Sequence, residues 1–274
     1  MIKLGLIGYP VSHSLSPKIQ NAALKASGLE GEYSLYPIAP DDMSALQALL
    51  ERVRSGAMTG FNVTIPHKQN VIPFMDELTP TAHAIGAVNV IYLRGDRLIG
   101  DNTDAPGFLS DLKKFLTTET QRHGELNALV LGAGGSARSV VYALCNDGWH
   151  VTLAARRIEQ AQQLASSFAQ YEIHNMNPAD LRLSTFDLIV NTTPLGMTPN
   201  VDQSPLPATV VLAPHTKIYD LVYNPRETKL VKDARAQGLS AITGLGMLIE
   251  QAALGFELWT GTTADRTVMQ QAVV

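Results

Sequence analysis

The amino-acid sequence predicts two α/β domains, the second built on a doubly wound parallel sheet. The chain has 274 residues, which is near the length at which one hydrophobic core gives way to two. Strand-like and helix-like hydrophobic patterns alternate along it, and the alternation starts again after Asp104. A glycine-rich turn then follows an apolar strand and precedes a helical run, as in sheets that bind nucleotides. We therefore expect a domain boundary near residue 104.

The first half alternates strands with helices and ends in a hairpin. Its strands are expected at residues 4–8, 60–65, 88–93 and 97–100. Its helices are expected to begin at Ser16, after an Asp41-Asp42 cap, and at Pro66. Gly28 should end the first of these helices, because glycine readily adopts the left-handed conformation that closes a helix.

The second half repeats one strand and one helix at a time, which is typical of a parallel sheet. A helix from Asp104 to about Leu116 opens it, and a polar stretch follows at 117–125. Its strands are expected at residues 126–131, 151–154, 187–190 and 218–222, and its helices at 158–169 and 226–236. From Gly244 the chain is predicted to form one last helix.

Composition excludes several classes of protein. With 45% hydrophobic and 17% charged residues, the chain has enough apolar surface to fold. Its net charge of -4 lacks the basic excess that a nucleic-acid backbone requires. No apolar run approaches the ~18 residues of a membrane span, and Met1 leads directly into an apolar strand rather than an export signal. We expect a cytoplasmic protein with neither nucleic acid nor membrane as a partner.

Cysteine and histidine usage gives no sign of a metal site. The single cysteine, Cys145, cannot form an internal disulfide, which fits a reducing compartment. The seven histidines are scattered without the spacing that metal ligands show. We expect no bound metal.

The glycine-rich turn at residues 132–137 carries the pattern G-x-G-x-x-A between a strand and a helix. This is the context of a dinucleotide-binding, Rossmann-like turn. Gly132 permits the tight turn, Gly134 lets the backbone approach a pyrophosphate, and Ala137 allows close contact between helix and strand. The alternative interpretation is an ordinary glycine-rich turn without a ligand.

The end of the next strand indicates which dinucleotide is bound. Sites that prefer NAD carry an acidic residue about 20 residues after the turn, but this chain has Ala155, Arg156 and Arg157 there. A guanidinium binds a 2′-phosphate through two hydrogen bonds, so the pair favours NADP. The alternative is that both arginines are solvated residues at a helix start, where cations are disfavoured unless an anion is present.

The first half contains polar residues that suit a small acidic substrate. Ser14 and Ser16 place hydroxyl groups at a helix start, where a carboxylate would be stabilised, although Ser16 could simply cap the helix. Asn62 and Thr64 share one face of a strand, and Lys68 follows in the helix expected beyond it. A buried lysine at a helix start loses its proton readily, so Lys68 is a candidate general base. A solvated surface lysine is the alternative.

Two more polar residues lie at the end of this half. Asn89 interrupts an otherwise apolar strand, and Asp104 stands at the expected domain boundary, where ligand clefts tend to form. Asp104 could orient a substrate or share a proton. It could also merely cap the helix that Pro106 begins.

Taken together, these segments resemble the shikimate dehydrogenase family. The resemblance rests on motifs in the family's order: SLSP at 14–17, NVTIPHK at 62–68, GAVN at 86–89, NTD at 102–104, GAGG at 132–135, NTTPLGM at 191–197, YDLVYNP at 219–225 and GLGMLIEQA at 244–252. It covers essentially the whole chain. It implies NADP-dependent interconversion of 3-dehydroshikimate and shikimate, a step toward chorismate and the aromatic amino acids.

The resemblance also implies the site residues and the domain organisation. Lys68 and Asp104 match the catalytic pair. The substrate would be bound by Ser14, Ser16, Asn62, Thr64, Asn89, Tyr223 and Gln251. NADP would be bound by Gly132, Ala133, Gly134, Gly135, Ser136, Ala137, Ala155, Arg156, Arg157, Thr192, Leu221 and Gly244. The last helix would return to the first domain, so that residues 1–104 and 245–274 bind substrate and residues 105–244 form the Rossmann-like NADP domain.

One departure and three alternatives stay open. Family members often carry Asn-Arg-Thr where this chain has Ala155-Arg156-Arg157, so an asparagine contact is lost and a second guanidinium is gained. The alternatives are a quinate/shikimate dehydrogenase that uses NAD or NADP, a ligand-sensing protein of the same fold without turnover, and an NADP-dependent dehydrogenase of another small carbonyl compound. A monomer or a homodimer is expected.

Overall fold

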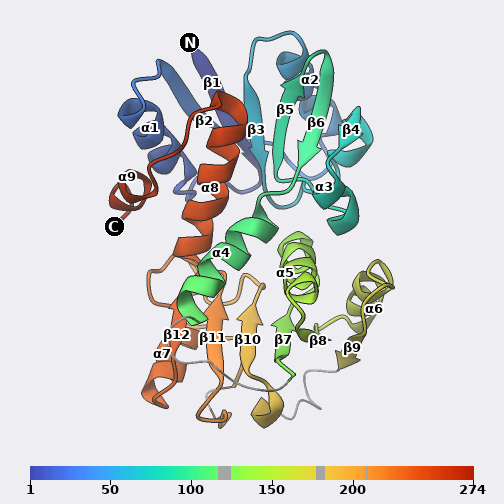
Figure 1. Cartoon of the computed structure of the whole chain (residues 1–274), viewed down its shortest axis with the longest axis vertical. Helices are drawn as coiled ribbons and strands as arrows, with labels where there is room; N and C mark the ends of the chain where they lie inside the picture. The colour runs from blue at the N-terminus through green and yellow to red at the C-terminus, as the bar shows by residue number, and fades with distance from the viewer. Residues whose placement is uncertain (117–124, 177–182, 208) are drawn as a thin grey trace. The chain divides into compact units, whose positions relative to one another are not determined.

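The computed structural model describes residues 1–116, 125–176, 183–207 and 209–274, and it divides into two compact units (Figure 1). The first unit comprises Met1–Gly107 and Ile249–Val274, and the second comprises Phe108–Leu248. Two helices, α4 (Asp104–Leu116) and α8 (Leu245–Thr260), contain the points at which the chain passes from one unit to the other.

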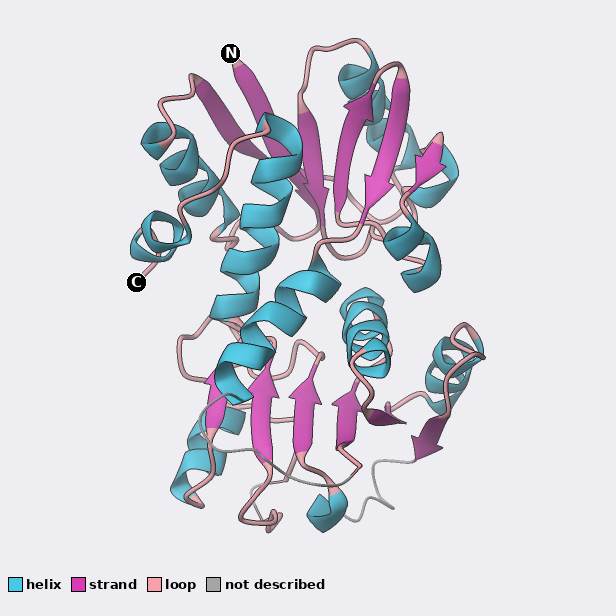
Figure 2. Cartoon of the chain, viewed as in Figure 1, coloured by secondary structure: helices cyan, strands magenta, loops and turns pink. Residues whose placement is uncertain are grey.

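The first unit contains a mixed six-stranded sheet, whose strands appear in magenta in Figure 2. Its order is β2-β1-β3-β5-β6-β4, with the bounds β1 Ile2–Gly8, β2 Gly31–Pro37, β3 Gly60–Val63, β4 Glu77–Leu78, β5 Val90–Arg94 and β6 Arg97–Asp101. Strands β2, β1 and β3 are parallel, whereas β5 runs antiparallel to both β3 and β6. The hairpin expected between β5 and β6 is confirmed, with Arg94 opposite Arg97 and Gly95 at a φ of 67°.

The helices of the first unit largely follow the sequence pattern. They are α1 (Ser16–Ala26), α2 (Met43–Arg54), α3 (Pro80–Ile85), most of α8, and α9 (Arg266–Gln271), with a 3₁₀ helix at Ile72–Phe74. The Asp42 carboxylate accepts a hydrogen bond from the Ala45 amide, which confirms the predicted cap of α2. Gly28 has a φ of 67° beyond the end of α1, as predicted.

The helix predicted to begin at Pro66 is wrong. Residues 65–71 form consecutive turns instead. The carbonyl of Lys68 accepts a hydrogen bond from the distant Val88 amide at 2.8 Å, and the His67 ring contacts the Ile38 carbonyl at 2.8 Å. These long-range partners compete with the local bonds that a helix would need. Lys68 therefore does not lie at a helix start, and no helix dipole acts on it there.

The second unit contains a wholly parallel six-stranded sheet of order β12-β11-β10-β7-β8-β9. The strand bounds are β7 Asn127–Leu131, β8 His150–Ala154, β9 Ile173–Met176, β10 Leu188–Asn191, β11 Lys217–Asp220 and β12 Ala241–Thr243. The order runs outward in both directions from the neighbours β7 and β10, which confirms the doubly wound sheet. In such sheets ligands bind at the carboxyl ends of the strands, where the order reverses.

The helices of the second unit alternate with its strands. They are most of α4, α5 (Gly135–Asn146), α6 (Ile158–Ser166) and α7 (Lys229–Ala236), with a 3₁₀ helix at Leu183–Thr185. The polar stretch expected after Leu116 lies almost wholly outside the described residues. Within the described part of the chain, no helix is both long and apolar enough to cross a membrane.

Candidate active site

The first unit holds a buried ion pair between two residues that are 36 positions apart. The Lys68 Nζ lies 2.5 Å from the Asp104 Oδ2, and the two residues are only 8% and 5% exposed. Lys68 lies in the turns after β3, and Asp104 is the first residue of α4. In a buried pair of this kind each group compensates the charge of the other. The alternative that Lys68 is a solvated surface residue is therefore wrong.

The alternative that Asp104 serves as a helix cap is also wrong. Helix α4 begins at Asp104 itself, and the Asn102 side chain accepts the hydrogen bond from the Ala105 amide. Both carboxylate oxygens of Asp104 face inward, one to Lys68 and the other to the Asn89 amide nitrogen, which donates at 2.8 Å. Lys68 and the Asn89 amide thus hold the Asp104 carboxylate in place. The carboxylate in turn fixes the position of the Lys68 Nζ.

Asn89 and Gln251 meet beside this pair, although 162 residues separate them. The Asn89 oxygen accepts the Thr103 amide at 2.7 Å, and the Asn89 nitrogen lies 3.5 Å from the Gln251 side-chain oxygen. The Thr103 hydroxyl donates to the Gln251 carbonyl at 3.1 Å. The structure therefore brings together Lys68, Asp104, Asn89 and Gln251, all within the first unit.

Asn62 lies directly behind Asn89, and both ends of its amide are already bonded. Its oxygen accepts the Tyr33 hydroxyl at 2.8 Å, and its nitrogen donates to the Asn89 carbonyl at 3.1 Å. Asn62 thus fixes the backbone of Asn89. Tyr33 escaped the sequence analysis, since a tyrosine in an amphipathic strand gives no sign of a partner 29 residues away.

The hydroxyl-bearing residues lie at the carboxyl ends of β1 and β3. The Ser14 hydroxyl accepts the Ser16 amide and lies 3.2 Å from the Ser16 hydroxyl. The N-cap residue of α1 is Leu15, and Ser16 is the first helical residue, so the interpretation of Ser16 as the cap is wrong. Thr64 follows β3 and packs its methyl against Gly8, where an added Cβ would come within 2.4 Å of it.

In the second unit, the glycine-rich turn leaves open space at the start of α5. Gly132 adopts a φ of 112°, and Ala137 is buried against the sheet. Apart from Gly134 itself and its chain neighbours, no described atom lies within 4 Å of a Cβ built there, and Gly134, the N-cap residue, makes no side-chain hydrogen bond to the helix. The helix starts at Gly135, followed by Ser136, with its first amides open to an anion. Ala133 completes a turn that fits a pyrophosphate.

Three more residues implied as NADP ligands line the same edge of the second sheet. Thr192 follows β10, and its hydroxyl donates to the Leu131 carbonyl at 2.7 Å. A Cβ on Gly132 would approach that hydroxyl to 2.5 Å, so the turn and the Thr192 loop require a glycine here. Leu221 follows β11, and its carbonyl would lie 2.4 Å from a Cβ on Gly244. The four residues follow consecutive neighbours in the sheet, with Gly132 after β7 and Thr192 after β10 at the reversal point, and Leu221 after β11 and Gly244 after β12 beyond it.

The arginine pair stands at the carboxyl end of β8, the next strand over. Ala155 is buried, whereas Arg156 and Arg157 are exposed. Neither guanidinium has an ion-pair or hydrogen-bond partner among the residues that the structure describes. The residues present therefore fit a dinucleotide that carries an additional phosphate at this end.

Tyr223 belongs to the second unit, where it lies half-buried on the loop after β11. The other residues implied as substrate ligands belong to the first unit.

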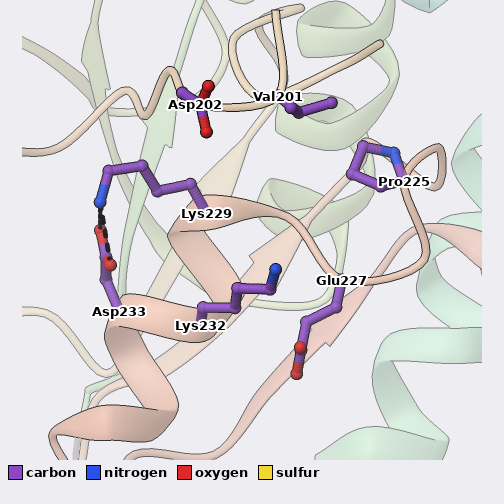
Figure 3. A pocket seen from close by; sticks show the side chains of 7 residues that line it. All are labelled: Val201, Asp202, Pro225, Glu227, Lys229, Lys232 and Asp233. Carbon is purple, nitrogen blue, oxygen red and sulfur yellow. Dashed lines mark hydrogen bonds and ion pairs between the residues drawn. The ribbon is translucent and has the colours of Figure 1, made fainter.

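A separate hollow in the second unit overlaps none of the predicted site residues. Its walls come from the loop around Val201 and Asp202 and from the segment between Pro225 and Asp233 (Figure 3). Lys229 and Asp233 form an ion pair at 2.8 Å on one wall. Within the described ranges, no cluster of His, Cys, Asp or Glu side chains has the make-up of a metal site.

Three family models match consecutive parts of the chain. Residues 6–91 match the shikimate dehydrogenase substrate binding domain, residues 115–207 match shikimate / quinate 5-dehydrogenase, and residues 244–274 match the shikimate 5′-dehydrogenase C-terminal domain.

Known proteins match over nearly the full length. The chain is 38% identical to shikimate dehydrogenase (NADP(+)) of Bacillus subtilis, over 98% of this chain and 95% of that protein. It resembles the solved Thermus thermophilus shikimate 5-dehydrogenase in complex with NADP(H) and shikimate, with a TM-score of 0.87, 38% identity, and 99% and 98% of the two chains covered. It also resembles the Corynebacterium glutamicum quinate dehydrogenase in complex with NAD, with a TM-score of 0.89, 29% identity and coverage of 99% and 98%.

Proposed function

The chain belongs to the shikimate dehydrogenase family, and we propose that it catalyses the reversible, NADP-dependent reduction of 3-dehydroshikimate to shikimate. This reaction leads toward chorismate and the aromatic amino acids. The B. subtilis and T. thermophilus relatives carry the corresponding names. The observation that carries the proposal for this chain is the buried Lys68–Asp104 pair, held by Asn89 and flanked by Gln251.

The two units take different parts in the proposed reaction. The first domain, residues 1–104 with 245–274, binds the substrate, and the second, residues 105–244, binds NADP. Ser14 and Ser16 donate hydrogen bonds to the substrate carboxylate at the start of α1, where the N-cap residue Leu15 offers no side-chain hydrogen bond. Thr64, Asn89, Asp104 and Gln251 hold the ring hydroxyls.

Lys68 handles the proton of the reaction. When bound, NADP supplies the hydride for reduction of the ketone and accepts it in the reverse direction. In reduction, the Lys68 ammonium gives a proton to the oxygen that becomes the alcohol and later regains one from solvent. In oxidation, neutral Lys68 removes the alcohol proton. Asp104 orients the Lys68 nitrogen through the 2.5 Å contact.

The cofactor preference rests on the second unit. The turn at residues 132–137 holds the pyrophosphate at the start of α5, and Arg156 and Arg157 hold the 2′-phosphate. Both guanidinium groups are exposed and without a described partner, which supports an anion as their ligand. Ala155, Thr192, Leu221 and Gly244 complete the NADP edge.

The assay that tests this function compares shikimate with quinate, each with NADP and with NAD, by the absorbance of the reduced nicotinamide. We expect rapid turnover only with shikimate and NADP. Comparable turnover of quinate or of NAD would favour the dual-specificity enzyme, which the likeness to a quinate dehydrogenase keeps as the second candidate. Absence of turnover with every pair would favour the ligand-sensing alternative.

We further propose that the protein acts in the cytoplasm as a monomer or a homodimer. Its single cysteine, Cys145, is compatible with a reducing compartment. Light scattering on the purified protein distinguishes the two assembly states.

A further inference from the structure

The second unit contains a buried carboxylate that the proposed reaction does not use. Asp220, the last residue of β11, is 0% exposed. Its Oδ1 accepts the Asn191 side-chain amide at 2.8 Å and the Val222 backbone amide at 3.0 Å, and its Oδ2 accepts the Thr228 hydroxyl at 2.6 Å. All three donors are neutral. Within the described ranges of the chain, no cation lies at ion-pair distance from Asp220.

The neighbouring elements leave this charge uncompensated. On α7, Lys229 pairs with Asp233, and Arg235 pairs with Glu227 just before the helix. Strand β12 places Thr243 opposite Asp220 in register, and β10 contributes Asn191.

The other face of β11 belongs to a different pair. The Tyr219 hydroxyl donates to the Asp111 carboxylate there, because successive strand residues point to opposite faces. Burial raises the pKa of Asp220 to about 6, although its three hydrogen bonds oppose the shift. Asp220 is therefore ionised above about pH 6, and no described residue supplies a cation to pair with it.

The three hydrogen bonds that Asp220 accepts do not by themselves require a charged side chain at position 220. Asn191 also accepts the Thr193 amide at 2.9 Å and the Thr193 hydroxyl at 2.7 Å, so the cluster ties together the loops after β10 and β11. A neutral acceptor could serve that structural purpose. Burying an ion without a counter-ion opposes folding, and such perturbed groups concentrate at functional sites.

The position of Asp220 relative to the NADP edge suggests the use of its charge. A dinucleotide lies across the reversal point of a doubly wound sheet, with one nucleotide over each half. The arginines at the end of β8 assign the adenosine half to the β7–β9 side. The nicotinamide half then lies over β10 and β11, and Asp220 is the last residue of β11, next to Leu221.

We infer that Asp220 is an electrostatic determinant of which redox form of NADP the protein prefers. This inference rests on the proposed NADP site. The oxidised nicotinamide ring carries one positive charge and the reduced ring carries none, so the buried carboxylate binds the oxidised form more tightly. The same attraction stabilises the positive charge that develops on the ring as hydride leaves it.

The inference specifies a pH dependence. The cationic ring lowers the pKa of Asp220, so binding of the oxidised form strengthens as pH rises through about 6. Binding of the reduced form lacks this contribution. The 2′-phosphate also titrates near this pH, with a pKa of about 6 as for other phosphate monoesters. That phosphate is common to both forms, so the ratio of the two dissociation constants cancels its effect.

The test is an equilibrium titration of the purified protein with NADP+ and, separately, with NADPH. The ratio of the NADPH to the NADP+ dissociation constant is compared among wild type, Asp220→Asn and the control Asp202→Asn. The control removes the same charge from an exposed position. We expect Asp220→Asn to lower the ratio about fivefold or more at about pH 8, because solvent ions screen a buried charge much less than an exposed one. The control should leave the ratio unchanged.

The other possible outcomes contradict either the inference about Asp220 or the proposed NADP site. If Asp220→Asn weakens both forms equally, Asp220 only holds the loops and the inference is wrong. If neither form binds to wild type, the proposed NADP site itself fails. If Asp220→Asn does not fold, the wild-type ratio from about pH 5 to pH 8 decides, since it must rise through the titration of Asp220. A constant ratio contradicts the inference.

Discussion

Two buried aspartates, one in each unit, each accept a hydrogen bond from an asparagine side-chain amide, but only one of them pairs with a described cation. Asp104 accepts the amide of Asn89 and pairs with Lys68, whereas Asp220 accepts the amide of Asn191 and has no cation among the described residues. The two proposals give the carboxylates different uses. The paired one is proposed to orient a cation that moves a proton, and the one without a described cation is proposed to act through its electric field.

Removing Lys68 would leave Asp104 without its cation and so make it resemble Asp220. Lys68→Ala removes the proton donor and leaves Asp104 buried without a cation. We expect kcat to fall roughly 10³-fold, the scale of general acid–base catalysis, while the KM values for shikimate and NADP change little. The free energy of unfolding should fall by about 3 kcal/mol because a buried charge loses its partner. Steady-state kinetics and denaturant unfolding measure the two effects.

The matched control is Lys18→Ala, which removes a lysine from an exposed position on α1. It should leave both kinetics and stability at wild-type values. A loss of kcat below about tenfold in Lys68→Ala would contradict the catalytic assignment.

The role assigned to Asp220 depends on NADP lying in the second unit, which the arginine pair tests. The double variant Arg156→Ala with Arg157→Ala removes the groups proposed to bind the 2′-phosphate, a phosphate that NAD lacks. We expect the KM for NADP to rise roughly 100-fold and the KM for NAD to change little, as measured by initial rates. Lys232→Ala, an exposed cation elsewhere in this unit, is the control. Equal effects on both cofactors would refute the phosphate contact.

The free energy of unfolding should also depend on pH through Asp220, because no described cation compensates its charge. Its pKa is raised from 3.8 to about 6 in the folded state. A raised pKa stabilises the fold fully below the unfolded pKa, and this contribution is lost as pH rises through about 6. Between about pH 4 and pH 7, wild type should therefore lose about 3 kcal/mol relative to Asp220→Asn. Denaturant unfolding at both pH values measures this difference. A difference independent of pH would mean that Asp220 is not the titrating group.

The smallest expected effect concerns Tyr33, which is linked to Asp104 through Asn62 and Asn89. Tyr33→Phe removes the hydroxyl that bonds to Asn62 and leaves a buried acceptor without that donor. We expect the free energy of unfolding to fall by about 1 kcal/mol and the KM for shikimate to rise about threefold, with the KM for NADP unchanged. Tyr171→Phe removes an exposed hydroxyl in the second unit and is the control. An increase in the KM for NADP alone would contradict the link from Tyr33 to the substrate site.

The two sites differ in how far the local sequence pattern predicts them. The glycine turn, its strand and α5 are specified by adjacent residues, so local pattern was sufficient for the second sheet. The expected helix at Pro66 failed because the Lys68 carbonyl bonds to Val88, a partner that local pattern does not contain. The alternative interpretation of Asp104 as a helix cap is wrong because the Asn102 side chain accepts the hydrogen bond from the Ala105 amide instead.

Two residues of interest lay beyond local reasoning altogether. Tyr33 bonds to Asn62 across the sheet, and Asp220 bonds to Asn191 from the neighbouring strand. Neither residue is unusual in its own segment. Only the tertiary fold shows that Tyr33 supports Asn89 through Asn62, and that Asp220 is buried with no cation among the described residues.

The most direct test of the proposed reaction follows the hydride itself. Shikimate that carries deuterium on the carbon of the hydroxyl to be oxidised is incubated with the protein and NADP, and the reduced cofactor is analysed by mass spectrometry. The account predicts reduced NADP that contains one deuterium from the substrate, together with 3-dehydroshikimate that has lost it. Reduced cofactor without the label, or no reduced cofactor at all, would contradict direct hydride transfer between shikimate and NADP on this protein.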